Sequence, residues 1–315
     1  MRSLTIVAAS IALVGCSVTT PTVPPPIPSA SMSESIPAAE TEWNAWHEAR
    51  IRSLAAPEGW LSLAGLVWLS DGDWTIGRKP GGLDDRRIEL EHAPADECGS
   101  FVVAGESVRF RPAPGTDATA DERPIKGEIT LVPDSAGSPT AVRFGPIAVT
   151  LVRRNGQFAL RIRDRESETR TRFAGIDRFR YDPSRRVEAT FTPAEAGATL
   201  GVRNVTGFVD ETPLAGELRF RLDGRDLTLL ATGDGSGGLF VVFGDLTNGR
   251  STYGGGRFLA VPAPADGKTT VDFNRATNPP CSFTPFATCP TPVAANRLPL
   301  AIEAGERSAP TGGHP

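Results

Sequence analysis

The chain is poor in the residues that most often carry catalysis and metal binding. It contains three histidines and four cysteines among 315 residues, too few for a dense cluster of metal ligands. His47, His92 and His314 stand in no recognisable catalytic motif, although Ser-His-Asp chemistry needs a histidine to accept the proton. We therefore expect no metal and no cofactor, and surface or capping roles for the three histidines.

Excess positive charge and a membrane-spanning apolar run are also missing. The formal net charge is −4 and the isoelectric point is about 5.6, so the chain lacks the basic footprint of a nucleic-acid-binding protein. The apolar stretch at residues 4–14 is too short to cross a bilayer as a helix. Nucleic acid is thus excluded as an expected partner.

The first sixteen residues have the pattern of an export signal. Arg2 supplies a positive start, residues 4–14 supply an apolar centre, and the sequence then reads LVGC up to Cys16. Small residues before a cysteine at this place resemble a bacterial lipobox, in which Cys16 becomes the lipidated N-terminus. An ordinary secretory signal or an uncleaved anchor, with Cys16 incidental in either case, is the alternative. Ser17, in place of an aspartate, favours the periplasmic face of the outer membrane over the inner membrane.

Composition divides the remaining chain. Residues 16–40 are rich in Pro, Ser and Thr and show no helical or strand period, which is typical of a disordered tether. After the signal peptide at 1–15 and this tether, we expect one all-β domain at 41–306 and a frayed tail at 307–315.

Apolar periodicity and turn residues predict the fold class. One helix is expected over residues 41–56, with Trp43, Trp46 and Leu54 on one face. The apolar run at 60–69 fits either a short helix or a strand. Asp-Gly or Asn-Gly pairs at 71–72, 155–156 and 223–224 are hairpin signals, and a fourth hairpin is expected around Gly105. Further strands are expected at 86–90, 127–132, 140–144, 186–192 and 239–243.

Strand thus follows strand with short turns, and long helices between strands are missing. This order predicts a mainly β chain, an antiparallel barrel or sandwich with one short N-terminal helix. Residues 253–306 are dense in Gly, Pro and Asn, so we expect a long ordered C-terminal loop region there.

Several runs of this tail resemble one known family. They are YGGGRFL at 253–259, DFNR at 272–275, NPPC at 278–281, CP at 289–290, NRLP at 296–299 and AGE at 304–306. Together with GWLSL at 59–63, GLVWL at 65–69 and RIRD at 161–164, they are similar to the domain of unknown function 1684 family over about residues 43–306. The resemblance implies no established activity.

The tail also collects polar side chains suited to a ligand. They are Tyr253, Arg257, Asp272, Asn274, Arg275, Asn278 and Arg297. Arginines offer fixed donor forks for carboxylate or phosphate. If the tail folds back on the β body, these residues could meet in one pocket for a small anionic or sugar-like ligand. The alternative is that they brace a long loop internally.

Two hypotheses about function stay open at this point. A ligand- or partner-binding envelope lipoprotein is the first hypothesis, and whether the protein is an enzyme is uncertain. A hydrolase that uses paired carboxylates such as Asp245 and Asp272 is the second. Arg161 and Arg163 alternate with Leu160 and Ile162, which puts both arginines on a face that is usually solvated.

The expected export of the protein to an oxidising compartment decides how the remaining cysteines are interpreted. In an exported protein, Cys281 and Cys289 are expected to form a disulfide across a short loop, with two free buried thiols as the alternative. Cys98 is then left over as a buried or idle thiol.

Overall fold

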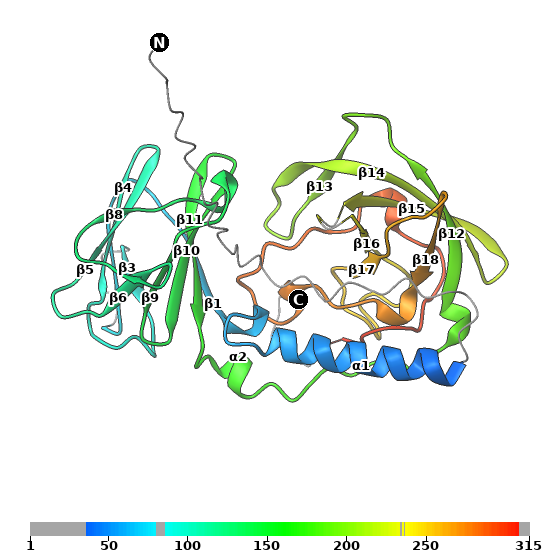
Figure 1. Ribbon diagram of the computed structural model, residues 1–315, viewed down its shortest axis with the longest axis horizontal. Helices are drawn as coiled ribbons and strands as arrows, with labels where there is room; N and C mark the ends of the chain where they lie inside the picture. Colours follow the sequence, from blue (N-terminus) through cyan, green and yellow to red (C-terminus); the bar gives the residue numbers. More distant parts are fainter. Residues whose placement is uncertain (1–35, 80–85, 234, 236, 309–315) are drawn as a thin grey trace, which may run out of the picture.

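The structure is a computed structural model that describes residues 36–79, 86–233, 235 and 237–308. It is mainly β, with one clear helix near the N-terminus, and its curled antiparallel sheets form a sandwich and a half-barrel (Figure 1). The predicted fold class is therefore confirmed. The signal peptide, Cys16, tether residues 16–35, the tail residues 309–315 and His314 lie outside the described residues.

The helix α1 spans Ile36–Leu54 and begins before the expected position at residue 41. Residues 36–40, which we assigned to the tether, are therefore helical. Its buried side chains follow a helical spacing of three and four residues, and they are Ala39, Trp43, His47, Arg50 and Leu54. Trp46 is only half-buried, and the expected surface role of His47 is wrong because this face packs against the body.

Two sheets build the sandwich that forms the first half of the body. The first has the order β1-β11-β10-β9-β6-β7, and the second has the order β3-β2-β4-β5-β8. The strands of the first sheet are β1 (Leu63–Trp68), β6 (Ala118–Ala120), β7 (Arg123–Pro124), β9 (Ala141–Phe144), β10 (Ile147–Arg154) and β11 (Gln157–Asp164). The strands of the second are β2 (Gly72–Gly77), β3 (Arg87–Glu89), β4 (Gly99–Ala104), β5 (Ser107–Pro112) and β8 (Ile129–Thr130).

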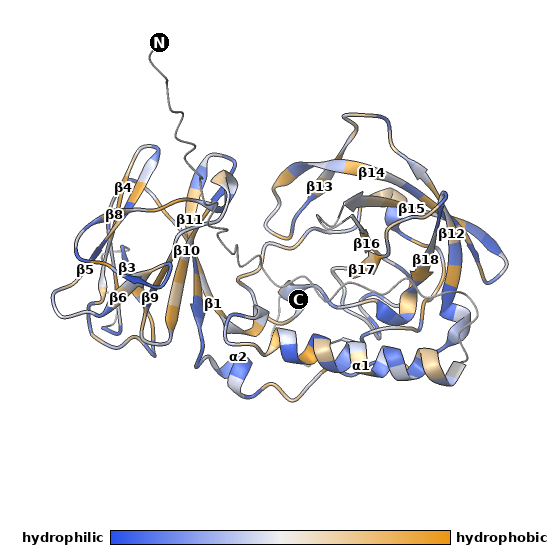
Figure 2. Ribbon diagram, in the orientation of Figure 1, coloured by the Kyte–Doolittle hydropathy of each residue, from blue (hydrophilic) through white to orange (hydrophobic). Residues whose placement is uncertain are grey.

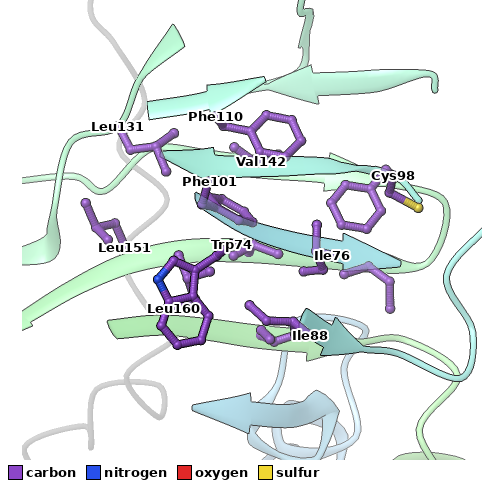
Figure 3. Close-up of a cluster of buried hydrophobic side chains, with 14 of the residues drawn as sticks. Trp74, Ile76, Ile88, Cys98, Phe101, Phe110, Leu131, Val142, Leu151 and Leu160 are labelled. Atoms are coloured by element: carbon purple, nitrogen blue, oxygen red, sulfur yellow. The ribbon is translucent and has the colours of Figure 1, made fainter. Parts of the chain in front are cut away.

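Alternating apolar side chains of both sheets meet in one core. Figure 3 shows Phe101, Phe110 and Leu160 among the buried side chains that fill it. Phe101 and Phe110 lie with ring centroids 4.9 Å apart. Because successive side chains point to opposite faces of a strand, the same alternation leaves polar residues on the outer faces, as the mixed colours of the strands in Figure 2 show.

The third sheet curls into a half-barrel around a second core (Figure 1). Its order is β17-β16-β15-β14-β12-β18, and β13 pairs with β14. The strands are β12 (Arg186–Pro193), β13 (Thr199–Arg203), β14 (Val209–Leu222), β15 (Arg225–Gly233), β16 (Leu239–Phe243), β17 (Arg257–Val261) and β18 (Lys268–Asp272). The first part of the expected loop region thus carries two strands, and the rest, up to residue 306, is irregular and largely buried.

The turn signals at residues 155–156 and 223–224 correctly predicted hairpins, and in both turns the two residues have a positive φ. Asn155 and Gly156 have φ of 47° and 79°, and Asp223 and Gly224 have φ of 49° and 75°, as a tight two-residue hairpin turn requires. The β4–β5 hairpin around Gly105 is also present. The hairpin expected at residues 71–72 is wrong, because β1 pairs with β11 whereas β2 pairs with β3 and β4.

Short helical turns join the strands. The ambiguous run at 60–69 contains both of the expected alternatives, a 3-10 turn η1 (Trp60–Ser62) followed by β1. The others are η2 (Asp134–Ala136), α2 (Glu168–Thr171), η3 (Pro183–Arg185), η4 (Phe273–Arg275), η5 (Pro280–Ser282) and η6 (Ala294–Asn296).

The two halves of the body have separate hydrophobic cores, and α1 runs along the half-barrel (Figure 1). That residues 41–306 fold as a single domain stays a prediction. Of the helices in the described part of the chain, none combines the length and the apolar character that crossing a membrane requires.

Candidate functional site

Arg257 is buried inside the half-barrel and has partners of its own chain. Its Nη2 donates to Asp245 at 2.5 Å and to the carbonyl of Ile302 at 3.0 Å, and its Nη1 donates to the carbonyl of Ala304 at 2.5 Å. Neither Arg257 nor Asp245 exposes any of its side chain. Burial lowers the pKa of Arg257, and Asp245 opposes that shift. Arg257 thus braces the irregular end of the tail against β17.

Asp272 and Asn274 organise the turn after β18. Asp272 Oδ1 accepts hydrogen bonds from the Asn274 backbone N–H at 3.0 Å and from its Nδ2 at 2.9 Å. Burial raises the pKa of Asp272, and the bonds from Asn274 oppose the rise. The Asn274 side chain also accepts from the Asp182 N–H at 2.9 Å and donates to the Asp182 carbonyl at 2.8 Å. These bonds attach the segment before β12 to the tail.

Arg275 and Asn278 connect the tail to α1. Arg275 Nη2 donates to Glu42 of the helix at 2.6 Å. The Asn278 N–H donates to Glu306 Oε2 at 2.6 Å, and its carbonyl accepts from Arg50 Nη2 at 3.0 Å. Arg50 Nε also lies 3.3 Å from Glu306 Oε1. Burial raises the pKa of Glu306, and Arg50 opposes this.

The last two predicted site residues lie apart from these contacts. The partly buried Tyr253 places its hydroxyl 3.5 Å from the carbonyl of Cys281, and burial raises its pKa. Arg297 follows η6 and is exposed. Its neighbour Asn296, which the sequence reasoning missed, is buried and bonds to the backbone of Leu230 at 2.7 and 2.9 Å. The seven predicted residues are therefore held mainly by contacts within the chain.

The predicted disulfide is not formed in the structure. Cys281 and Cys289 are both free and buried. The Sγ of Cys289 lies over the backbone of Cys281 and accepts its N–H at 3.2 Å, in place of a bond between the two sulfurs. Cys98 is also free and buried, as its expected role as an idle thiol implies.

An open pocket lies elsewhere, between α1 and the segment at 178–181. It has a volume of about 530 Å³ and is lined by Glu40, Trp43 and Asn44 of the helix together with residues 178–181. None of the seven predicted residues lines it. One signal in the sequence pointed to this site, namely the helical spacing that put Trp43 on a buried face.

Arg178 is the central cation of this pocket. Its guanidinium stacks over the Trp43 ring at 3.9 Å, and its Nη2 donates to Asn44 at 2.8 Å. Its Nη1 is buried without a hydrogen-bond partner among the described residues. Burial lowers the pKa of Arg178, while Glu48 and Glu40 oppose the shift. A buried donor without an acceptor is costly, so this nitrogen marks the place where an acceptor from outside would be favourable.

The tail positions both walls of this pocket. The Phe179 N–H donates to the carbonyl of Gly305 at 3.0 Å, and the Arg307 N–H donates to the carbonyl of Asp177 at 2.8 Å. On the other wall, Trp43 Nε1 donates to the carbonyl of Asn274 at 2.7 Å. Of the residues that were predicted to touch a ligand, Asn274 therefore acts one layer behind the pocket, through its bond to Trp43.

His92 and His47 have different surroundings. His92 is partly exposed and lies 2.6 Å from Asp164, a hydrogen bond that raises its pKa. His47 is buried behind the pocket, where burial and then the positive charge of Arg178 lower its pKa to about 4. Within the described residues, no group of three or more His, Cys, Asp or Glu side chains is placed to hold a metal ion.

The lowered pKa of His47 predicts an acid-sensitive fold. An unfolded chain protonates histidine near 6.5, whereas folded His47 stays neutral down to about 4. The unfolded state therefore binds more protons in this interval, and stability should fall as the pH falls from about 6.5 towards 4. An NMR titration of the imidazole should show a midpoint near 4, and the His47→Gln variant identifies the signal. A midpoint near 6.5 would contradict the buried position.

Comparison with known proteins relates part of this architecture to a family. Residues 171–307, which include 178–181 and the tail but not α1 or the sandwich, match the family described as "Protein of unknown function (DUF1684)". The motifs at 59–69 and 161–164 that resembled this family lie outside the match. No curated protein matches the chain.

Among solved structures, the chain is similar to an uncharacterized protein of Haloarcula marismortui determined by NMR in solution. The sequence identity is 36%, the match covers 44% of this chain and 78% of that chain, and the TM-score is 0.36. On the family match, residues 171–307 of this chain belong to the DUF1684 family of proteins of unknown function.

Proposed function

We propose that this protein is a bacterial envelope lipoprotein whose pocket between α1 and residues 178–181 binds a small ligand with an anionic group. The observation that carries the proposal is Arg178, which lines the pocket together with Trp43 and Asn44 and whose buried Nη1 has no acceptor among the described residues. A small turn of the guanidinium would let a ligand carboxylate accept from it.

The other residues at the pocket favour a carboxylated sugar within this class. Arg180 is exposed and adds a second cation, whereas Glu40 is exposed and offers an acceptor for hydroxyl groups. Phe179 and Tyr181 are half-buried rings at the same wall. Apolar ring surface beside a few polar groups is a common composition of small-molecule sites. A ligand with one negative charge, several hydroxyls and an apolar ring face would match all of these groups.

The envelope location rests on the sequence. A positive residue, an apolar stretch and Cys16 follow each other in the order of a lipoprotein signal. In this proposal the lipid on Cys16 anchors the protein at the periplasmic face of the outer membrane, and the body presents its pocket to envelope molecules.

The hydrolase alternative has no supporting observation. Asp245 bonds Arg257 in a site closed to solvent, and Asp272 caps η4. Each carboxylate has an internal structural partner, and neither lines the pocket of α1.

Removal of the Arg178 charge should weaken binding at the pocket. Arg178→Gln keeps a hydrogen-bonding side chain but loses the cation, so we expect at least a tenfold weaker affinity for glucuronate, measured by calorimetry. Glucose, which has the ring without the charge, should bind the wild type more weakly than glucuronate does. Circular dichroism shows whether the variant is folded.

Arg172→Gln is the matched control, because Arg172 is an exposed arginine of the same segment that pairs with Glu168 and lies outside the pocket. It should bind glucuronate as the wild type does. Equal affinity of the folded Arg178→Gln variant and the wild type, or no binding of any probe by the wild type, would contradict the proposal.

Loss of Cys16 should abolish lipidation. In cells supplied with labelled palmitate, the wild-type protein should carry label and sediment with membranes. Cys16→Ser should carry none, because serine cannot replace the modified thiol, and Cys98→Ser should be labelled normally. Unchanged labelling of Cys16→Ser would refute the lipoprotein assignment.

A further inference from the structure

A second cationic feature lies on the outer face of the first sheet. Strand β11 directs Leu160 and Ile162 into the sandwich core, where both are buried. Arg161 and Arg163 alternate with them and therefore share the opposite face. In the sequence this face was expected to be solvated, but both arginines are partly buried.

The half-barrel and the tail cover this face. Leu63 of β1, which pairs with Arg163, packs in a cluster with Cys281 and Cys289 of the tail. Farther along β1, the rings of Trp68 and Phe208 lie 5.9 Å apart. The arginines thus stand in the seam between the two halves of the body.

The carboxylates near the pair already serve other arginines. Asp134 accepts from Arg154 through both oxygens, at 2.9 and 2.8 Å. Glu58 accepts from Arg143 at 2.6 Å. Four arginines therefore face two acidic groups, and Asp210, farther out, acts on Arg154. The seam keeps a local excess of positive charge although the whole chain has a negative net charge.

The side chains of Arg161 and Arg163 have no hydrogen bond or ion pair with any described residue, and the Nε of each is buried without a partner. Burial, followed by the charge of Arg163, lowers the pKa of Arg161 to about 10, so both side chains remain cations at neutral pH. Two uncompensated cations on one half-covered strand face are unfavourable unless an anion accompanies them.

We propose that Arg161 and Arg163 form a binding site for a phosphate group in the seam between the sandwich and the half-barrel. Residues i and i+2 of a strand lie about 7 Å apart, which lets two guanidinium forks approach one tetrahedral oxyanion from opposite sides. Arginine forks fit phosphate oxygens in pairs. The bound group would neutralise the face and join β11 to the tail that covers it.

This site lies apart from the pocket beside α1, and it is tested with a different probe and different variants. The probe is inorganic phosphate added to the full folded protein in a phosphate-free buffer. The ¹⁵N signals of arginine Nε report the contact directly. We expect saturable shifts of the Arg161 and Arg163 signals and a rise of the melting temperature with phosphate concentration.

The double variant Arg161→Gln/Arg163→Gln should lose both responses. Because it removes two repelling cations, its melting temperature without phosphate should equal or exceed that of the wild type, so misfolding does not explain the loss. Arg111→Gln, an exposed arginine of β5 that pairs with Glu128, is the control and should respond as the wild type does. Arg178→Gln should respond likewise.

Vesicles of phosphatidylglycerol distinguish a lipid headgroup from free phosphate as the source. Binding to vesicles that the double variant loses would assign the site to a headgroup, whereas a response to inorganic phosphate alone would assign it to a soluble phosphate. Absence of shifts at Arg161 and Arg163 with both probes, or an unchanged response of the double variant, would overturn the proposal.

Discussion

The buried ion pair of Arg50 and Glu306 is the contact on which the arrangement of this protein depends. It joins a helix near the start of the body to Glu306 in the C-terminal tail, and the same carboxylate accepts the backbone N–H of Asn278. A buried charge that loses its partner is strongly destabilising. The pair therefore helps to hold α1 against the half-barrel, together with the bonds of Trp43 to Asn274 and of Glu42 to Arg275.

The pocket is a consequence of this docking. One wall is α1, and the other wall is a segment that pairs with the backbone of Gly305 and Arg307. The buried polar groups of the tail thus form a frame, although Arg257 Nε and Asn278 Oδ1 within it also have no partner among the described residues. Arg178 differs from these two residues because it also lines a pocket, so we infer a ligand there and not inside the frame.

Local sequence signals predicted the elements that depend on local physics. The Asn155–Gly156 and Asp223–Gly224 hairpins formed because each turn needs two residues with positive φ, and these residues accept it. The signal at Asp71–Gly72 failed because the chain leaves one sheet for the other at this place. The polar residues of the tail were found, and their internal bracing was one of two alternatives that the sequence left open, since their partners Glu42, Arg50 and Asp182 are remote in sequence. The sequence contains no signal for Arg178, because the burial of its Nη1 without a partner arises only in the folded chain.

A double-mutant cycle on Arg50 and Glu306 measures whether the polar tail residues dock α1 through this ion pair. Arg50→Gln, Glu306→Gln and the double variant are unfolded in urea, and the coupling free energy is taken from the four stabilities. If the pair docks the helix, we expect a coupling free energy of at least about 1 kcal/mol, within the range for directly interacting residues. Additive effects, equal to the sum of the single variants within about 0.5 kcal/mol, would show that α1 is held by other means.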